Sequence, residues 1–300
     1  MGSPIVFWMY VAGVVCLGVS GFVARKDVAA AHGLDKLTAL ALVFFAAPLA
    51  VFGAEHLTDA HDIMQLIPVW MPGRLFWAYF VGVALIAASV SLSLKRYLLL
   101  TGLMVALMFF LFVLMMHIPG VAANPHDRFS WAVAFRDLSF GAGALALAGA
   151  MTPSLSSNRG NLAYALARIF IGVTLVVYGV EHFLHPLSAP GVPLEKMMPA
   201  WVPLPYLWAY LTGAIEVVAG AALLINRYVR EAAISAGGVM VFWTLFLYVP
   251  LLAMARSVPG IVEGLNYVFD TLLFGGTVLL LSPRLSRILN IGITRAGGSI

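Results

Sequence analysis

The chain has 300 residues, of which 62% are hydrophobic and only 10% are charged, and its mean hydropathy is +0.98. A soluble protein of this length needs a larger charged surface, so the composition predicts an all-α integral membrane protein, whose backbone polar groups are satisfied within helices. Seventeen Lys and Arg against thirteen Asp and Glu leave a net charge of +4. Basic loops of a membrane protein explain this excess without a nucleic-acid partner. The single cysteine, Cys16, excludes an internal disulfide framework or a cysteine-cluster metal site.

Nine apolar segments follow one another along the chain. Most approach the ~20 residues that a helix needs to cross a hydrocarbon core, although the last is shorter. The first segment has neither a basic region before it nor a small-residue cleavage site, so we expect a retained transmembrane helix rather than a signal peptide. The nine predicted spans are residues 4–23, 37–53, 73–94, 97–116, 131–150, 162–180, 205–225, 232–252 and 267–281.

The charges between these segments predict their orientation. If nine spans alternate, one side of the membrane receives most of the basic residues, and basic loops are typically cytoplasmic. We therefore expect the N-terminus outside and the C-terminus in the cytoplasm. The predicted cytoplasmic side holds Arg25, Lys26, Lys36, Lys95, Arg96, Arg159, Arg168, Arg227, Arg230, Arg284, Arg287 and Arg295. The predicted outer loops hold Glu55, Asp59, Asp62, Asp127, Glu195 and Glu263.

Two stretches of the chain carry nearly the same residues in the same order, which predicts an internal duplication. Four spans in each repeat make the two units parallel, so their pseudo-twofold axis should lie along the membrane normal. The matched residues are Glu55-His56 with Glu181-His182, Trp70 with Trp201, Pro72 with Pro203, Trp77-Ala78-Tyr79 with Trp208-Ala209-Tyr210, His117 with Tyr248, and Asp137 with Asp270.

The repeat divides the chain into five parts. An N-terminal helix and its loop, residues 1–36, precede a first four-helix unit, residues 37–150. A linker rich in Ser, Asn and Gly, residues 151–161, joins it to a second four-helix unit, residues 162–282, and a cytoplasmic tail follows at 283–300.

The matched polar residues map to the outer third of the membrane. Glu-His ends the first helix of each unit, the Trp and Tyr residues lie where the second helix enters, and Asp137 and Asp270 are predicted in the opening turns of the fourth. Each has a structural explanation: an interfacial aromatic belt, a solvated helix end, or a carboxylate that complements a helix dipole. Their recurrence in one layer favours a shared site, and we expect Glu55, His56, Trp70 and Asp137 to gather there, mirrored by Glu181, His182, Trp201 and Asp270.

Glu216 is the one carboxylate predicted deep inside a span. It lies about eleven residues into a helix that starts at Pro205, which places it ~16 Å along the helix axis, and its counterpart in the first repeat is Leu85. We expect its side chain to face the bundle interior and to be mostly protonated. It is then either a neutral acid that bonds a neighbouring helix or a functional group such as a proton relay.

No motif names a metal site or a catalytic residue. His182 and His185 share a helix face if the helix extends that far, but a haem bound between His56 and His182 lacks supporting residues around it. The sequence contains no Walker loop, dinucleotide fingerprint, nucleophile elbow or HExxH.

The motifs of the second half are those of a known family. They are Arg168-x-x-x-Gly172, Tyr178-Gly-Val-Glu-His-Phe-Leu-His-Pro186, Pro199-Ala-Trp-Val-Pro203, Trp208-Ala-Tyr-Leu-Thr-Gly213 and Asn266-Tyr-Val-Phe-Asp270. They resemble the DoxX family of small four-helix bacterial membrane proteins, and residues 37–282 resemble a tandem pair of such units. The first half departs from the pattern with Leu42 in place of Arg168, and His182 stands where many members carry lysine.

The resemblance implies a bacterial plasma membrane protein with a quinone cofactor. Family members are linked to quinone-coupled redox complexes, such as the small subunits of thiosulfate:quinone oxidoreductase, so the lipid bilayer and other subunits of a redox complex are the implied partners. Our leading hypothesis is therefore a quinone-interacting subunit with a site near the outer membrane face. A small-solute transporter built from parallel repeats and an assembly factor without activity of its own are the alternatives.

Candidate residues for this site follow from what a quinone head group requires. Its carbonyls need hydrogen-bond partners and its reduction needs a proton donor, and an imidazole can serve as both. We predict Glu181, His182 and Glu216 as catalytic residues. Aromatic walls and further polar contacts are expected from Trp201, Trp208, Tyr210, Asp270, Glu55, His56 and Asp137.

Overall fold

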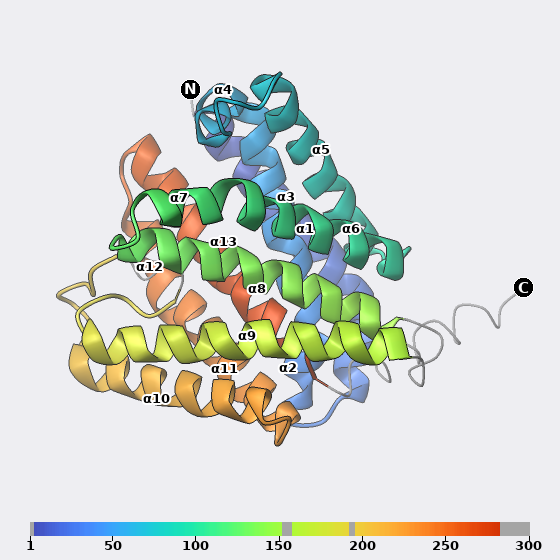
Figure 1. The fold of residues 1–300 in the computed structure, drawn as a ribbon, viewed down its shortest axis with the longest axis vertical. Coiled ribbons are helices and arrows are strands. Elements are labelled where there is room, and N and C mark those ends of the chain that lie inside the picture. Colours follow the sequence, from blue (N-terminus) through green and yellow to red (C-terminus); the bar gives the residue numbers. More distant parts are fainter. Residues whose placement is uncertain (1–2, 152–157, 192–195, 283–300) are drawn as a thin grey trace, which may run out of the picture.

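The computed structural model describes residues 3–151, 158–191 and 196–282, with the backbone alone for residues 158–161. These residues contain helices and no β-strand, apart from one isolated bridge between Ser188 and Met197 (Figure 1). The helices are α1 (Pro4–Ala30), α2 (Asp35–Ala39), α3 (Ala41–Thr58), α4 (Ala60–Ile63), η1 (Met64–Leu66), α5 (Arg74–Ser93), α6 (Leu98–Phe112), η2 (Val113–His117), α7 (Ile118–Ala123), α8 (Arg128–Ala150), α9 (Asn158–Leu184), α10 (Pro205–Leu224), α11 (Val229–Trp243), η3 (Thr244–Tyr248), α12 (Val249–Met254) and α13 (Val258–Leu279).

Eight helical stretches among the described residues are long and apolar enough to cross a membrane, so the chain is an all-α, multi-pass integral membrane protein. They are α1, α3, α5, α6 through α7, α8, α9 from Leu162, α10, and α11 through α12. The ninth predicted span corresponds to α13, whose 22 residues also suffice in length. Helix α13 is buried almost continuously from Gly264 onwards, and a helix enclosed by protein can carry more polar residues than one facing lipid.

Two pairs of helices at matching places in the two predicted repeats have equal lengths. Helices α5 and α10 have 20 residues each, and α6 and α11 have 15 each. Both α6 and α11 continue through a five-residue π-helical segment, η2 or η3, into a six-residue helix. The turns before them also match, because Tyr97 and Tyr228 both adopt a left-handed backbone, with φ of 54° and 52°. Such π-helical segments often occur at functional sites.

The two halves interlock around a central pair of helices, α8 and α13. Helix α3 of the first half packs against α13 of the second, and α9 of the second packs against α8 of the first. Helices α5 and α6 complete one ring around this pair, α10 and α11 complete the other, and α1 covers α3 (Figure 1). Each ring therefore takes helices from both predicted units.

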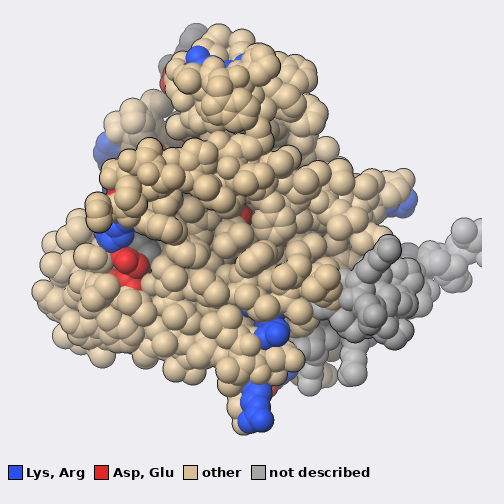
Figure 2. All heavy atoms as spheres, in the orientation of Figure 1, with Lys and Arg blue, Asp and Glu red and all other residues tan. Residues whose placement is uncertain are grey.

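The helix connections collect at two ends of the bundle. The end that holds α4 and the α7–α8, α9–α10 and α12–α13 connections, at the top and left of Figure 1, is called the α4 end. The opposite end, which holds α2, is the α2 end, where the ion pairs Lys95–Asp27 and Arg230–Asp35 tie the helices together. Between the ends, the face in Figure 2 shows almost no charged side chain, as expected of a surface in contact with lipid.

Candidate functional site

A cluster of four polar side chains joins the two halves at the α8–α13 pair, and we call it the seam cluster. Nε of Arg136 lies 2.9 Å from Oδ1 of Asp137, and a terminal nitrogen of Arg136 lies 2.9 Å from Oδ2 of Asp270. Nε2 of His117, in η2, lies 2.8 Å from Oδ2 of Asp137. A carboxylate beside an arginine only accepts hydrogen bonds, so Nε2 of His117 is the donor. One guanidinium therefore serves the two matched aspartates, because the residue that corresponds to Arg136 in the second half is Phe269.

Both aspartates lie nearer the middle of their helices than the sequence predicted. Asp137 is nine residues after Arg128, where α8 begins, and Asp270 is twelve residues after Val258, where α13 begins. At 1.5 Å per residue these positions are roughly 14 and 18 Å along the axes. The prediction that Asp270 lies in the opening turns of its helix was wrong. Helix α13 begins at Val258, well before residue 267, where the sequence predicted the start of the span. A helix-dipole role does not explain either aspartate, since that effect is confined to the first turn.

Glu55, on α3, extends this polar layer into the ring that α5 and α6 complete. Its Oε1 accepts a hydrogen bond of 2.9 Å from the side-chain amide of Asn266, one turn before Asp270 on α13. His56 takes no part in it, because its Nδ1 lies 2.8 Å from the carbonyl oxygen of Phe52 in its own helix. The adjacent residues Glu55 and His56 therefore have separate surroundings.

His182 and Glu216 form a second, separate pair between α9 and α10. Nε2 of His182 lies 3.6 Å from Oε2 of Glu216, and both side chains have an exposed fraction of 0%. Within the described part of the chain, neither imidazole nitrogen and neither carboxyl oxygen of this pair has a hydrogen-bond partner. Glu216 lies inside the bundle, as expected, but without the hydrogen bond to a neighbouring helix that a purely structural acid would make.

Glu181 points away from this pair and toward the surface. Its Oε2 lies 3.2 Å from a terminal nitrogen of Arg128, at the start of α8, and 3.7 Å from Nε2 of His185. His185 is about half exposed. The cluster of Arg128, Glu181 and His185 thus lies at the α4 end, next in sequence to the buried His182.

Asp127 caps the N-terminus of α8, immediately before Arg128. Asp127 accepts hydrogen bonds from the backbone N–H groups of Phe129 and Ser130, and the Ser130 hydroxyl holds the pKa of Asp127 below its ordinary value. The cap therefore contributes stability above the pKa of the unfolded chain, ~3.9, and loses it as the pH falls through the lower folded pKa. We expect Asp127→Ala to speed hydrogen exchange at these two amides at neutral pH, whereas Asp62→Ala should leave them unchanged.

The predicted aromatic residues do not gather around these polar groups. Trp201 and Tyr210 have exposed fractions of 47% and 43%, and Trp70 is exposed as well. Trp208 packs edge-on against Trp243 of α11, with ring centroids 5.7 Å apart. In the described part of the chain, no hydrogen bond or ring contact links these aromatics to the seam cluster or to the His182–Glu216 pair. Trp70, Trp201 and Tyr210 line the surface of the bundle, whereas Trp208 is partly buried against its core.

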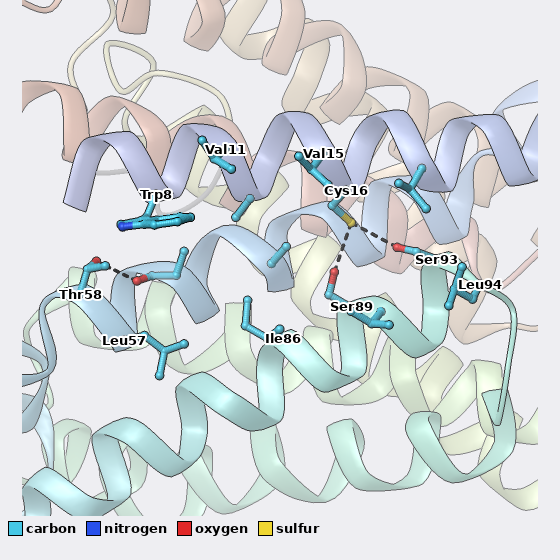
Figure 3. A pocket seen from close by; sticks show the side chains of 15 residues that line it. Trp8, Val11, Val15, Cys16, Leu57, Thr58, Ile86, Ser89, Ser93 and Leu94 are labelled. Carbon is cyan, nitrogen blue, oxygen red and sulfur yellow. Dashed lines mark hydrogen bonds between the residues drawn. The ribbon is translucent and has the colours of Figure 1, made fainter. Parts of the chain in front are cut away.

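A groove of about 640 Å³ opens between α1, α3 and α5, and we call it the α1 groove (Figure 3). Its walls are apolar except for Thr58 and one group of polar side chains near the α2 end. There the Sγ of Cys16 lies 3.1 Å from the Ser89 hydroxyl and 3.2 Å from the Ser93 hydroxyl. Trp8 and Thr58 line the other end of the groove.

Sequence reasoning missed Arg136 and the polar group of the α1 groove. Arg136 lies inside the predicted span 131–150, and an ionisable residue within a span is a signal that could have identified it. Ser89 and Ser93 are four residues apart and therefore share one helix face, but nothing in the sequence indicates that Cys16 of a distant helix lies against them.

Comparison with known proteins adds one match. A search of curated proteins and a search of solved structures return no match to this chain. The model of the DoxX family matches residues 163–249, which comprise most of α9, all of α10 and α11, and η3. The match contains His182, Glu216 and the glycines between them, and it lies in the half that resembles the family more closely in sequence. Residues 163–249 are therefore similar to the DoxX family, and the match supports membership of that family.

Proposed function

We propose that this chain is a quinone-interacting subunit of a membrane redox complex and that the α1 groove holds the quinone. The observation that carries the proposal is the groove itself. Its volume of about 640 Å³ lies within the ~300–1,000 Å³ of ordinary small-molecule sites. It opens among membrane-spanning helices, so a lipid-soluble ligand can enter from the bilayer. An apolar wall suits an isoprenoid tail, and one polar group suits a carbonyl-bearing ring.

A quinone fits the α1 groove better than the surroundings of the His182–Glu216 pair. The pair His182–Glu216 has no exposed side-chain surface, and neither residue lines the α1 groove. The α1 groove offers hydrogen-bond donors in Ser89, Ser93 and Cys16. A bound quinone supplies a centre that exchanges two electrons and two protons. In this proposal the serine hydroxyls orient a carbonyl oxygen, the apolar walls exclude water, and partner subunits deliver the electrons.

The proposal includes the duplication and the membrane orientation. The equal lengths of α5 and α10 and of α6 and α11, together with the matching turns before α6 and α11, support an origin by duplication, with an axis along the α8–α13 pair. The basic residues of the α2 end support a cytoplasmic position for that end. The α4 end, with Glu55, Glu181 and His185, then faces outside, in the plasma membrane of a bacterium.

The test is binding of decylubiquinone to the purified protein in nanodiscs, measured by quenching of tryptophan fluorescence. The double variant Ser89→Ala, Ser93→Ala should bind about tenfold more weakly, because losing hydrogen bonds worth ~1.4 kcal/mol in total corresponds to that factor. Val15→Trp should abolish binding, since Val15 lines the groove and is half exposed, so that a larger side chain can fill the space.

Two controls locate the site. Val14→Trp places the same bulk on the neighbouring exposed valine, which does not line the α1 groove, and should bind normally. His182→Ala should also bind normally. Loss of binding in His182→Ala with normal binding in Val15→Trp would move the site to the second half, and absence of quinone binding by the wild type would reject the proposed function.

A further inference from the structure

We propose that His182 and Glu216 form an intramembrane binding site for a single exchangeable proton, loaded from the α4 end. The inference does not depend on the proposed function, since the pair lies in the second half and the α1 groove lies between helices of the first half and α1. The chemistry requires only that an imidazole and a carboxyl group share a site from which water and other partners are excluded.

The geometry of the pair supports a shared proton. The closest approach, 3.6 Å between Nε2 of His182 and Oε2 of Glu216, is slightly longer than a hydrogen bond. No other described residue bonds either group. A small side-chain rotation that shortens the Nε2–Oε2 distance by a few tenths of an ångström would form a hydrogen bond between His182 and Glu216. Neither residue would lose another hydrogen bond in that movement. Buried polar side chains with a structural role instead have at least one hydrogen-bond partner.

The charge balance of the pair favours one bound proton. Without a proton, a neutral imidazole beside a carboxylate leaves one buried negative charge, which is costly in a low-dielectric interior. With one proton the pair is neutral, either as imidazole with carboxylic acid or as imidazolium with carboxylate. Transfer within the loaded pair breaks the O–H bond of Glu216 and forms an N–H bond on His182, and the total charge stays at zero. Release to water at the α4 end then leaves the carboxylate.

Few other charged groups face the pair. From α8, Arg128 interacts with His182, and this arginine is already paired with Glu181. From α9, the hydroxyl of Tyr178 interacts with Glu216 while it donates to the carbonyl oxygen of Ala132. The charged residues of α11, Arg230 and Glu231, lie at its α2 end and pair with each other.

In this proposal the proton enters through the cluster of Arg128, Glu181 and His185 at the α4 end. His185 contacts solvent and lies 3.7 Å from Glu181, and Glu181 precedes His182 directly in the chain. The first half has no histidine–glutamate pair at the corresponding positions. Its corresponding residues are His56, which is bonded within its own helix, and Leu85, so that only the second half retains the acid.

The test is infrared spectroscopy of the protein in nanodiscs, which resolves the carbonyl stretching band of a protonated carboxylic acid. We expect such a band in the wild type at neutral pH, its loss in Glu216→Gln, and a shift in its frequency in His182→Gln. On transfer to D₂O the band should shift as the proton exchanges, and the exchange should be slower in the double variant Glu181→Gln, His185→Ala than in the wild type.

A matched control and an alternative variant keep the outcome decisive. Glu55→Gln removes a carboxyl group that has an amide partner and should leave the Glu216 band in place. If Glu216→Gln fails to fold, Glu216→Leu installs the residue of the first half and should remove the same band. An unchanged band in both Glu216 variants would overturn the proposal. A band that His182→Gln does not shift, or that never exchanges in D₂O, would also overturn it.

Discussion

Arg136→Leu is expected to cost about 3–5 kcal/mol of stability, the range found when one member of a buried ion pair is removed. The side chain of Arg136 contacts both Asp137 and Asp270 at 2.9 Å, and all three have limited exposure to solvent. Leucine would fill much of the space but leave two carboxylates without their common counter-ion. The measurement is equilibrium unfolding in mixed micelles of a mild detergent and SDS, followed by tryptophan fluorescence.

Two further variants separate charge from packing. The triple variant Arg136→Leu, Asp137→Asn, Asp270→Asn should recover part of the loss, because it removes the uncompensated charges, so that the three changes are not additive. Arg136→Lys should be intermediate, since a lysine keeps the charge but cannot bond two carboxylates with one planar group. A loss below ~1 kcal/mol in Arg136→Leu, the usual range of exposed pairs, would show that the seam cluster does not hold the halves together.

Alanine at Gly179 or Gly220 is expected to destabilise the α9–α10 contact by about 1–3 kcal/mol for each substitution, as overpacked interiors generally are. A Cβ on Gly179 would lie 2.6 Å from the carbonyl oxygen of Gly213, and one on Gly220 would lie 2.7 Å from that of Gly172. Both obstacles are backbone atoms, which cannot rotate away. Small residues permit such close approach between membrane helices, which gain stability mainly from packing.

Gly18 and Gly21 of α1 provide the matched control. A Cβ at either position would meet no atom within 4 Å. Alanine there should leave stability unchanged or raise it by up to ~1 kcal/mol, because glycine is less favourable than alanine inside a helix. The same unfolding assay applies to all four variants, and equal effects in α1 and in the α9–α10 contact would contradict the proposed role of close backbone approach. The contact also sets the distance across which His182 faces Glu216, so Gly179→Ala should in addition shift the Glu216 infrared band.

The helices and the membrane class were predictable from the sequence, because both follow from local properties. A span needs enough consecutive apolar residues, and its backbone bonds are made within the segment. Helix ends were predicted less well where polar residues continue a helix. Thus α13 begins at Val258, because Ser257 accepts a hydrogen bond from Gly260 and proline is tolerated in the first turn, although Glu263 and Asn266 interrupt the apolar run.

The depth of Glu216 within its span was predictable for the same local reason, because that depth follows from the number of residues between Glu216 and the start of its helix. Its partner was not predictable, because the register between α9 and α10 is a property of their contact. The glycines bring the two helices together at Gly179 and Gly213, and this registry places His182 against Glu216.

The composition of the seam cluster depended most on tertiary structure. Asp137 and Asp270 were recognisable as matched residues, but the sequence placed each in its own four-helix unit. The chain instead packs the last helices of both halves side by side, and one arginine on α8 then reaches both carboxylates. Sequence patterns report which face of a helix is apolar, whereas the pairing of polar groups depends on which helices meet and at what height. That choice is made by packing over the whole bundle, since no single segment contains both partners.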